Sequence, residues 1–506
     1  MRTARESVCA NAVPPVGRGH RVLVVDLNNF STFPTLAIGL LTAALRAAEF
    51  SVQVLAPLAY DVSVAAREHP ERLVDHLARR MHLSTAPAFR APRDMLRYMH
   101  GAWRSRSDPK TLQLVRDALE QRPDIVLLSA YLQHFASVAA IASAARRAGI
   151  PVLLGGPVFN NEETAQIWGS IPGVSAVYGG EADLIVPHIV SAILKGEDLL
   201  AFQGVTLSDG RHTPAAPPLR RLEDAPIPDF RDFPWHKYPV RIVPVMATRG
   251  CQWDRCTFCS DITSVSGRTF RSRTLQSLMA ELEEQARRHQ TKDFLFLDLK
   301  LNSQPSLLRG ITAQIQSHVP GARWIGTVHV DTRVDNGLSG VELKAAASAG
   351  MRRVSFGLET GSQRLLDAMD KGCTVERNSK FIHDASEAGL SIRCTMFKGY
   401  PGETASDLEE TAMFLEAHGH LIDRIRFNEF SIIPGTRIFG DVRSQPRLFP
   451  ELKIVRHEAK SGRTHYWNKG ATSGAYRRAK ARVLRAVYEI NKRPISGTAR
   501  EFDGLM

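Results

Sequence analysis

The sequence predicts an α/β protein with an N-terminal doubly wound parallel sheet, a partial (β/α)6 barrel and a C-terminal helical extension. Three observations predict this class. Short apolar runs alternate with segments of helical apolar spacing along most of the 506 residues, as in parallel sheets covered by helices. A proline-rich stretch, residues 204–239, separates two series of such alternations. Three of the six cysteines lie between positions 251 and 259, directly after the first strand of the second series.

The composition indicates a globular protein with more than one domain. Hydrophobic residues make up 43% of the chain and charged residues 23%, and its length exceeds what one core usually organises. No apolar run approaches the roughly 20 residues of a membrane helix. Residues 1–19 contain no apolar signal segment. We therefore expect a flexible N-terminal tail and a cytoplasmic protein without a membrane partner.

The net charge of +13 permits an acidic partner such as nucleic acid. The arginines are dispersed rather than gathered in one run, however. A solvated basic surface therefore accounts for the charge at least as well, and we do not expect nucleic acid as a partner.

The first series, residues 20–203, predicts the doubly wound sheet. The expected strands are residues 22–26, 51–55, 125–129, 152–154 and 174–178, and the expected helices are 36–48, 112–121, 138–148 and 183–194. Residues 61–106 are rich in arginine and histidine at helical spacing. We interpret them as a helical insertion of this first domain with a solvated face.

Ligands of such sheets bind outside the carboxyl ends of the strands. The residues that we expect there are Asn28, Phe33, His134, Phe135, Gly155, Gly156, Gly180 and Glu181. Glycine pairs let the backbone approach a bulky ligand closely. Ordinary turn chemistry explains such pairs equally well, and each aromatic or polar residue here has packing as its alternative role.

The second series, residues 240–436, predicts six strand–helix units. The expected strands are 242–247, 294–298, 324–330, 353–357, 391–397 and 424–432, with helices at 275–289, 306–316, 341–349, 375–388 and 405–417. A closed barrel of this type has eight units. Six units leave an open side for a large substrate or a second domain. Residues 437–506 form an extension that ends in a basic helix, 476–492.

The cysteine loop contains Cys251, Cys256 and Cys259. Three thiolates on one loop match a [4Fe–4S] cluster with one iron left open for another ligand. A zinc site is the alternative, because two cysteines separated by two residues are also a zinc spacing. Zinc would require a fourth protein ligand, and the candidates, Cys373 and Cys394, are distant in sequence.

Several further stretches agree with the prediction of an iron–sulfur cluster. They are Phe296-Leu297-Asp298 with Asn302, residues 357–362 followed by Asp370-Lys371-Gly372, residues 399–404, and Pro434-Gly435-Thr436. With the cysteine loop, they resemble the radical S-adenosylmethionine (SAM) superfamily over residues 240–436. The family usually separates its first two cysteines by three residues, and here there are four.

The resemblance implies a TIM-type partial barrel in which the three cysteines hold a [4Fe–4S] cluster. It also implies that SAM is contacted by Phe258 between two cysteines, by Asp298, Asn302 and Glu359 at strand ends, and by Arg393 on the fifth strand. For Arg393 the notable feature is a charged residue on a buried strand, which predicts a carboxylate partner. That partner is either the methionine carboxylate or an internal acid. Phe258 and Glu359 have packing and loop capping as their alternative roles.

The upstream domain is similar to the Rossmann-like cobalamin-binding domain found in one branch of this superfamily. The similar stretches are residues 22–26, 33–41, 122–129, 154–157 and 179–181, with 226–230 in the linker. No histidine has the Asp-x-His-x-x-Gly setting of a cobalt ligand. The resemblance therefore implies cobalamin bound without that histidine, with the loop residues named above, from Asn28 to Glu181, as candidate contacts.

This branch implies an enzyme, and we expect a methyltransferase that acts on an unactivated carbon. The reaction uses a 5′-deoxyadenosyl radical and methylcobalamin, and an external electron donor such as flavodoxin or ferredoxin. The expected substrate is a natural product or a peptide. The catalytic residues, the oligomeric state and the exact substrate have no signal in the sequence.

Three alternatives accompany this expectation. The first is an enzyme of the same branch that cyclises or rearranges its substrate without methylating it. The second is a methylthiotransferase, which needs three cysteines in its N-terminal domain; we set it aside because only Cys9 precedes Cys251. The third is a basic nucleic-acid-binding protein with a structural metal site.

Overall fold

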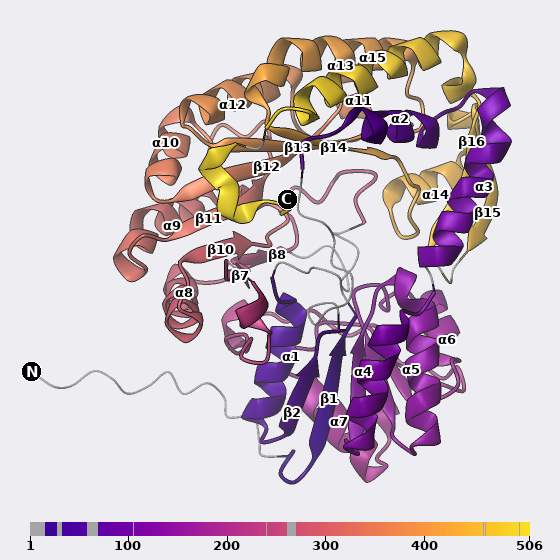
Figure 1. Cartoon of the computed structure of the whole chain (residues 1–506), viewed down its shortest axis with the longest axis vertical. Helices are drawn as coiled ribbons and strands as arrows, with labels where there is room; N and C mark the ends of the chain where they lie inside the picture. Colours follow the sequence, from indigo (N-terminus) through magenta and orange to yellow (C-terminus); the bar gives the residue numbers. More distant parts are fainter. Residues whose placement is uncertain are drawn as a thin grey trace, which may run out of the picture. The chain divides into compact units, whose positions relative to one another are not determined.

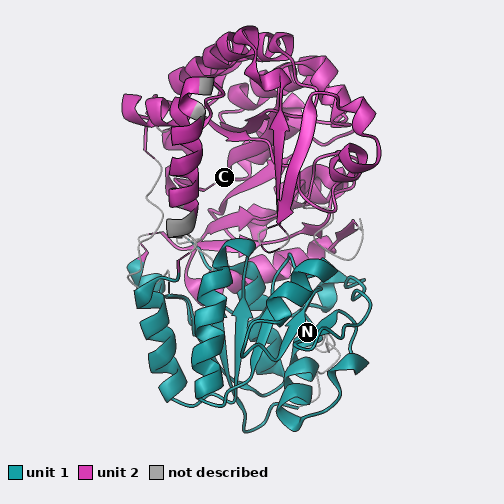
Figure 2. Ribbon diagram, turned by 90° about the vertical axis from the view of Figure 1, so that its right-hand side faces the viewer, with its two compact units in different colours: residues 1–64, 107–237 teal, residues 65–106, 238–506 magenta. Residues whose placement is uncertain are grey.

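The structure is a computed structural model of the whole chain. It describes residues 16–27, 33–57, 69–104, 106–238, 240–260, 270–458, 460, 462–494 and 496–505. The chain forms two compact units (Figure 2). Unit 1 comprises residues 1–64 and 107–237, and unit 2 comprises residues 65–106 and 238–506. No helix within the described ranges is both long and apolar enough to cross a membrane.

Unit 1 contains a six-stranded sheet in the order β2-β1-β3-β4-β5-β6. Its strands are β1 (Arg21–Asp26), β2 (Ser51–Leu55), β3 (Ile125–Ser129), β4 (Val152–Gly155), β5 (Ala176–Tyr178) and β6 (Val205–Leu207). The first five are parallel, and β6 runs antiparallel to β5. The predicted class is thus confirmed, whereas β6 lies in the stretch that the sequence assigned to the linker. Three residues are too short to show a strand period.

Helices cover both faces of this sheet (Figure 1). One face carries α1 (Leu36–Ala47) and α7 (Val186–Lys195), and the other carries α4 (Pro109–Glu120), α5 (Phe135–Arg147) and α6 (Glu162–Gly169). Alternate residues of β1 supply the two cores, with Val24 packed toward α1 and Val25 toward α5. The sheet is therefore doubly wound, and the carboxyl ends of its parallel strands meet at one edge.

Part of the linker lies against α1. Arg46 of α1 forms ion pairs with Asp229 at 2.7 Å and Asp232 at 2.8 Å. A Cβ on Gly39 would overlap the ring of Phe230, so the glycine makes room for the linker. These contacts explain why residues 229–232 are ordered despite their proline-rich surroundings. The short 3-10 turns nearby are η3 (Leu199–Ala201), η4 (Leu222–Asp224) and η5 (Trp235–Lys237).

Unit 2 contains six parallel strands in the order β14-β13-β12-β11-β10-β7. They are β7 (Ile242–Val245), β10 (Asp293–Phe296), β11 (Arg323–Val328), β12 (Met351–Glu359), β13 (Ser391–Lys398) and β14 (Arg424–Glu429). A short antiparallel pair, β8 (Thr248–Arg249) and β9 (Arg271–Ser272), follows β7. This is the predicted partial barrel.

Helices line the outer side of the second sheet (Figure 1). They are α8 (Leu275–His289), α9 (Pro305–His318), α10 (Gly340–Ser348), α12 (Val375–Glu387) and α13 (Ala405–His418), with the short α11 (Gln363–Ala368) after β12. α8 begins where the Thr274 side chain accepts the Ser277 N–H, and its buried residues include Leu278 and Leu282, one turn apart.

The helices α2 (Leu73–His82) and α3 (Pro87–Arg104) belong to unit 2. The sequence placed them within the first domain as a solvated insertion. Instead, Arg97 of α3 forms a 2.7 Å ion pair with Glu429 of β14, and the Leu83 carbonyl after α2 accepts a 2.7 Å hydrogen bond from Lys480. Partners more than 300 residues away hold this segment, and no local pattern predicts them.

The C-terminal extension contains a hairpin as well as helices. Its elements are α14 (Arg437–Ser444), β15 (Leu452–Glu458), β16 (Arg463–Asn468), α15 (Gly474–Asn491) and η12 (Gly497–Phe502). The remaining short turns of unit 2 are η7 (Leu301–Ser303), η8 (Gly419–Leu421), η9 (Pro446–Leu448) and η11 (Gly470–Thr472). α15 packs along α13, and the basic helix differs from the predicted one by two residues at its start and one at its end.

The last residues close the amino end of the second sheet. Arg353, near the start of β12, donates to the carbonyls of Phe502 at 2.7 Å and Ala499 at 3.2 Å. Arg393, near the start of β13, donates to the Leu505 carbonyl at 2.7 Å. The opposite, carboxyl end of the strands carries the cysteine loop, as expected for a site in this architecture.

Candidate functional site

The cysteine loop begins at a turn that is fixed by Asp298. The Asp298 carboxylate accepts hydrogen bonds from the Thr248 N–H at 2.6 Å, the Thr248 hydroxyl at 2.6 Å and the Ala247 N–H at 3.2 Å. Burial raises the pKa of Asp298 to about 6, although the same hydrogen bonds oppose the rise. The chain therefore leaves β7 in a defined direction, toward Cys251.

The middle of the loop is attached to the segment after α11. The Thr257 N–H donates to the Met369 carbonyl at 3.0 Å, and the Trp253 indole N–H donates to the Asp370 carbonyl at 2.7 Å. The Thr257 hydroxyl also lies 2.7 Å from the Tyr400 hydroxyl. These bonds hold the loop on two sides, which pre-organises the cysteines that it carries.

The four residues between Cys251 and Cys256 are each accommodated. Gln252 accepts a 2.8 Å hydrogen bond from Arg333, and Arg255 lies 3.4 Å from the Asp370 carboxylate. Asp254 takes a left-handed backbone conformation, with φ of 42°, that asparagine and aspartate tolerate better than most residues. The extra residue of the spacer is thus absorbed by a turn.

The three thiols are partly buried and share one neighbourhood. Burial raises the pKa of the Cys256 thiol to about 12, and the charges of Cys259 and Cys251 act on it in the same direction. Among the described residues, no three His, Cys, Asp or Glu side chains are close enough to bind one metal ion. In a [4Fe–4S] cluster each thiolate binds a different iron, so its ligands stand further apart than those of a single ion. Three thiols on one loop are the donor set that such a cluster takes when one iron is left open.

A buried ion pair lies beside this loop. Lys371 Nζ is 2.9 Å from Glu359 Oε1, and both side chains are at most about one-tenth exposed. Burial alone would lower the pKa of Lys371, but Glu359 and then Cys256 outweigh it and raise the pKa above its usual value. A Cβ on Gly357 would overlap the Glu359 carboxylate. The glycine is therefore required for the pair, and Glu359 itself has a positive φ of 60°.

A second set of buried charges follows β10 and β11. Lys300 pairs with the fully buried Asp331, whose carboxylate also lies 2.9 Å from Arg333. Burial lowers the pKa of Lys300, whereas Asp331 and the more distant Cys251 thiol act to raise it. Arg333 links this group to the loop through Gln252. Two cations thus share one carboxylate next to the first cysteine.

His329 lies between these groups. Its ring packs edge-on against Trp253, with centroids 6.1 Å apart. Burial lowers the pKa of His329 well below its usual value, and Lys371 and Lys300 lower it further, so the ring is neutral. Its Nε2 is buried and has no hydrogen-bond partner in the described part of the chain. The site therefore contains one buried ring nitrogen near the cysteine loop that the described residues leave unbonded.

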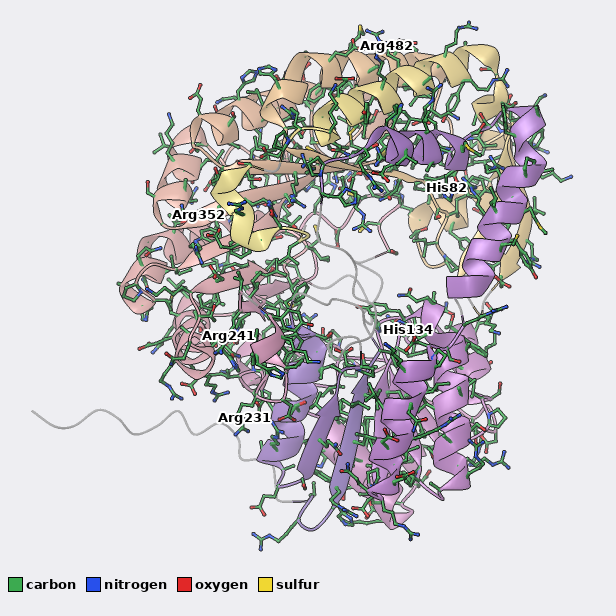
Figure 3. The ribbon with its side chains drawn as sticks, in the orientation of Figure 1. His82, His134, Arg231, Arg241, Arg352 and Arg482 are labelled. Carbon is green, nitrogen blue, oxygen red and sulfur yellow. The ribbon has the colours of Figure 1, made fainter. Side chains whose placement is uncertain are left out.

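In unit 1, His134 lies in η2 (Leu132–His134), directly after β3 at the carboxyl edge (Figure 3). Its Nδ1 accepts the Tyr131 N–H at 3.1 Å, and burial lowers its pKa to about 4. The ring is thus neutral and its orientation fixed. Phe135 packs on Trp168, with ring centroids 4.9 Å apart, and belongs to the core. Phe33 is buried, and Asn28 lies outside the described residues.

Three glycines at this edge are explained by the packing of the chain itself. A Cβ on Gly156 would overlap the Ala130 carbonyl, and one on Gly179 would overlap the Phe159 carbonyl. At Gly180 it would lie 2.9 Å from the Tyr178 hydroxyl. Glu181 accepts the Leu219 N–H at 2.8 Å. Only Gly155 among these glycines has open space beside it, its nearest atom being the Tyr178 carbonyl oxygen at 3.8 Å.

Residues 245–415 match the family model of the Radical SAM superfamily. The match runs from the end of β7 through the cysteine loop to α13. Residues 245–415 form a radical SAM domain. The chain is also 27% identical over 327 residues to an uncharacterized methyltransferase, PH0819, of Pyrococcus horikoshii, covering 63% of this chain and 69% of that protein. It is 27% identical over 259 residues to an anaerobic magnesium-protoporphyrin IX monomethyl ester cyclase of Rubrivivax gelatinosus, covering 49% of this chain but only 45% of the cyclase.

Two solved structures share the fold of nearly the whole chain. The cobalamin-dependent SAM radical enzyme OxsB, with aqua-cobalamin and SAM bound, aligns with a TM-score of 0.67 at 16% identity, over 91% of this chain and 66% of OxsB. The radical SAM methyltransferase TsrM of Kitasatospora setae, with cobalamin and a [4Fe–4S] cluster bound, aligns with a TM-score of 0.65 at 17% identity, over 92% and 91% of the two chains. The radical SAM domain and unit 1 are therefore both features of this fold.

Two of the residues predicted to contact SAM form hydrogen bonds to other parts of the chain. The Asn302 amide donates to the His329 carbonyl at 3.0 Å and the Asn336 carbonyl at 2.9 Å, and it accepts the His329 N–H at 3.0 Å. Arg393 bonds Leu505 at the amino end of the sheet, opposite the cysteine loop. The Arg393 guanidinium thus reaches a backbone carbonyl, because the C-terminal segment returns beneath the strands.

Phe258, Glu359 and the three cysteines are brought together by the fold. The Phe258 ring lies 5.6 Å from Lys371 Nζ and packs edge-on against Phe397. Lys300, His329, Asp331 and Lys371 are the neighbours that sequence reasoning missed. Lys371 stands in the stretch Asp370-Lys371-Gly372 that carried part of the family resemblance, and this was the available signal. For the others, no local pattern marks a buried charge.

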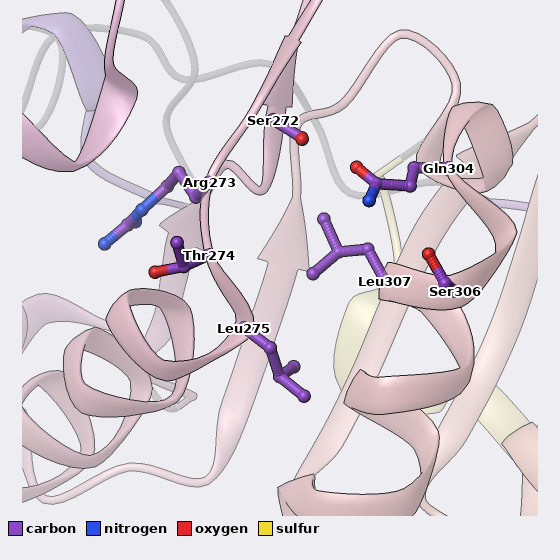
Figure 4. Close-up of a pocket in the computed structure, with 7 residues that line it drawn as sticks. All are labelled: Ser272, Arg273, Thr274, Leu275, Gln304, Ser306 and Leu307. Carbon is purple, nitrogen blue, oxygen red and sulfur yellow. The ribbon is translucent and has the colours of Figure 1, made fainter.

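The radical SAM domain also has a small pocket between the start of α8 and the start of α9 (Figure 4). It has a volume of about 310 Å³ and is lined by Ser272, Arg273, Thr274, Leu275, Gln304, Ser306 and Leu307. None of the predicted site residues lines it. Arg273 forms an ion pair with Glu281, so its charge is already neutralised within the domain.

Proposed function

We propose that this protein is a cobalamin-dependent radical SAM methyltransferase acting on an unactivated carbon of a natural product or a peptide. The observation that carries the proposal is the shared fold: both units align with OxsB and TsrM over nine-tenths of the chain, and the three cysteines stand at the carboxyl end of the partial barrel. The methyltransferase PH0819, which is similar over 63% of the chain, supports the transfer of a methyl group.

The bound groups would supply a 5′-deoxyadenosyl radical from SAM and a methyl group from cobalamin. The part of the chain is to bind these groups and to orient them. Cys251, Cys256 and Cys259 hold the cluster, and the bonds of Thr257 and Trp253 to residues 369–370 keep these thiols in place. Phe258 and Glu359 border the SAM site, and Asp298 acts by directing the loop, since its oxygens are occupied by Ala247 and Thr248.

For cobalamin, the proposed contacts are the carboxyl-edge loops of unit 1. Gly155 leaves space for close approach, and the neutral His134 has its Nδ1 held by the Tyr131 N–H. The predicted set is completed by Gly156, Gly180, Glu181, Phe33, Phe135 and Asn28. The required electron comes from an external one-electron donor such as flavodoxin or ferredoxin.

The test is anaerobic reconstitution with iron and sulfide, followed by ultraviolet–visible and electron paramagnetic resonance (EPR) spectroscopy. We expect a [4Fe–4S] signal that is lost when Cys251, Cys256 and Cys259 are changed together to Ala. Persistence of that signal in the triple variant would overturn the cluster assignment. Purified protein that retains no cobalamin after growth with the vitamin would overturn the methyltransferase assignment.

A second candidate is a cobalamin-dependent radical SAM enzyme that closes a ring without methylation. The similarity to the Rubrivivax gelatinosus cyclase over half of the chain favours it. The two candidates differ in their products. A methyltransferase forms S-adenosylhomocysteine and 5′-deoxyadenosine together with a product heavier by one methyl group, whereas a cyclase forms no S-adenosylhomocysteine.

The nucleic-acid alternative receives little support from the basic helix α15. Arg482 forms ion pairs with Glu409 at 2.7 Å and with Glu416, both on α13, and Lys492 pairs with Glu489 at 2.6 Å (Figure 3 marks Arg482). Lys480 is buried against the turn after α2. Three of the cations in this region are thus neutralised or enclosed, which leaves fewer of them for phosphates.

A further inference from the structure

Lys371 places a buried positive charge directly against the cysteine loop. The loop lies on residues 369–372, since Thr257 and Trp253 bond the carbonyls of Met369 and Asp370. The Lys371 side chain extends from this platform to within 5.6 Å of the centre of the Phe258 ring, between Cys256 and Cys259 in sequence. Its residue is only 8% exposed, so water screens its charge weakly.

Glu359 supplies the matching negative charge, and the pair is oriented. The carboxylate lies 2.9 Å from Lys371 Nζ, at the carboxyl end of β12. The Lys371 ammonium is the end of the pair that lies over the Phe258 ring of the cysteine loop, 5.6 Å from its centre. The pair therefore directs its positive end toward this loop. Gly357 provides the space for this arrangement, because a Cβ there would overlap the Glu359 carboxylate.

We propose that Lys371 and Glu359 set the reduction potential of the cluster held by the three cysteines, with Lys371 raising it and Glu359 lowering it. The inference rests on the proposed function. Reduction from [4Fe–4S]²⁺ to [4Fe–4S]⁺ takes one electron from the external donor and adds one negative charge, with no bond formed or broken. A nearby cation stabilises the reduced state and a nearby anion destabilises it.

This role differs from that of the other buried lysine of the site. Lys300 pairs with Asp331, and that carboxylate is also bonded by Arg333 and held within the loops after β10 and β11. Lys371 instead pairs with Glu359 and faces an aromatic ring of the cysteine loop. Substitutions at Lys371 and Glu359 should therefore move the potential in opposite directions.

The experiment is an EPR-monitored redox titration of the full-length, anaerobically reconstituted protein without SAM. Lys371→Met is expected to shift the midpoint to more negative potential, and Glu359→Gln to more positive potential. Lys371→Arg keeps the charge and is expected to restore most of the shift. The control is Lys380→Met, because Lys380 is an exposed lysine on α12 paired with Asp384 at 2.6 Å. It removes the same formal charge and is expected to leave the midpoint unchanged.

A more negative midpoint for Lys371→Met and a more positive midpoint for Glu359→Gln, with no shift in the control, support the proposal. Unchanged midpoints, or shifts of both variants in the same direction, overturn it. If Lys371→Met does not retain a cluster, Glu359→Gln decides alone, and a midpoint that is unchanged or more negative overturns the proposal. Failure of the proposed function is distinct, because the unsubstituted protein would then assemble no cluster at all.

Discussion

The indole ring of Trp253 occupies the space that a side chain on Gly372 would fill. A Cβ built on Gly372 would overlap the six-membered part of the indole, and the same ring donates its N–H to the Asp370 carbonyl at 2.7 Å. Gly372 also has a positive φ of 65°. Trp253 belongs to the four-residue spacer between Cys251 and Cys256, so this contact is how the longer spacer is seated on the radical SAM domain.

Gly372→Ala is expected to displace the Trp253 ring and lower the cluster content after reconstitution. The left-handed backbone costs about 1 kcal/mol for alanine, and the overlap adds about 1–3 kcal/mol. The matched control is Gly389→Ala, with φ of 75° and no atom within 4 Å of the new Cβ. Iron and sulfide analysis and thermal unfolding check both variants. Equal cluster content in the two variants would show that the contact does not position the loop.

The sequence predicts the strands and the cysteine loop because both depend on local patterns. The periodic spacing of apolar residues predicts β10 and β12, and the three cysteines, Cys251, Cys256 and Cys259, lie within nine positions of the sequence. Arg393 shows where this reasoning ends. Its place on a buried strand predicted a carboxylate partner, whereas the structure shows it donating to the carbonyl of Leu505, 112 residues further along the chain. No periodicity encodes such a return of the C-terminus.

The unit that α2 and α3 join could not be predicted for the same reason. Their arginines suggested a solvated face, yet Arg97 pairs with Glu429 and Arg79 pairs with the buried Glu71.

The glycine pairs of unit 1 were predicted to be open to a ligand, but the chain itself fills the space beside them. Gly156 and Gly180 looked available for a ligand, but the Ala130 carbonyl and the Tyr178 hydroxyl lie beside them. A glycine in the sequence signals close approach without saying what approaches.

Arg353→Met is expected to lower the stability of unit 2 by about 3–5 kcal/mol. Arg353 is fully buried and donates to the carbonyls of Phe502 and Ala499, which its loss leaves without these donors. The adjacent Arg352→Met is the control, since Arg352 is partly exposed. Denaturant unfolding monitored by circular dichroism checks both. A similar midpoint for the two variants would contradict a structural role for the C-terminal closure.

The free energy of unfolding of Glu403→Gln, relative to that of the unsubstituted protein, is expected to increase as the pH rises. Glu403 accepts the Gly399 N–H at 2.6 Å and the Tyr476 hydroxyl, and burial raises its pKa to about 7. A carboxyl whose pKa is higher in the folded state favours folding fully only below its unfolded pKa. That contribution is lost between about pH 4.5 and 7, an effect of up to about 3 kcal/mol.

The measurement is the urea midpoint of both proteins at several values between pH 5 and 8. The control is Glu416→Gln on α13, the helix that begins two residues after Glu403. Arg482 lowers the pKa of Glu416 through a side-chain hydrogen bond, so this carboxyl stays ionised throughout that range. Its stability difference from the unsubstituted protein is therefore expected to stay constant. Parallel curves for Glu403→Gln would show that Glu403 does not change its charge on folding.

Arg97→Met is expected to loosen α2 and α3 from the radical SAM domain. Burial would raise the pKa of Glu429, but Lys398 and Arg97 outweigh it and lower the pKa to about 2, so the carboxylate is ionised at neutral pH. Lys398 Nζ at 2.6 Å remains as its partner in the variant, and the loss of Arg97 costs about 1–3 kcal/mol. Hydrogen exchange in residues 73–104 should accelerate while exchange in α8 stays unchanged.

The control is Arg287→Met. Arg287 forms an exposed ion pair with Glu284 on α8, and we expect its loss to change the stability by no more than about 0.5 kcal/mol. Equal exchange in α3 of all three proteins would mean that apolar packing, not Arg97, holds the segment.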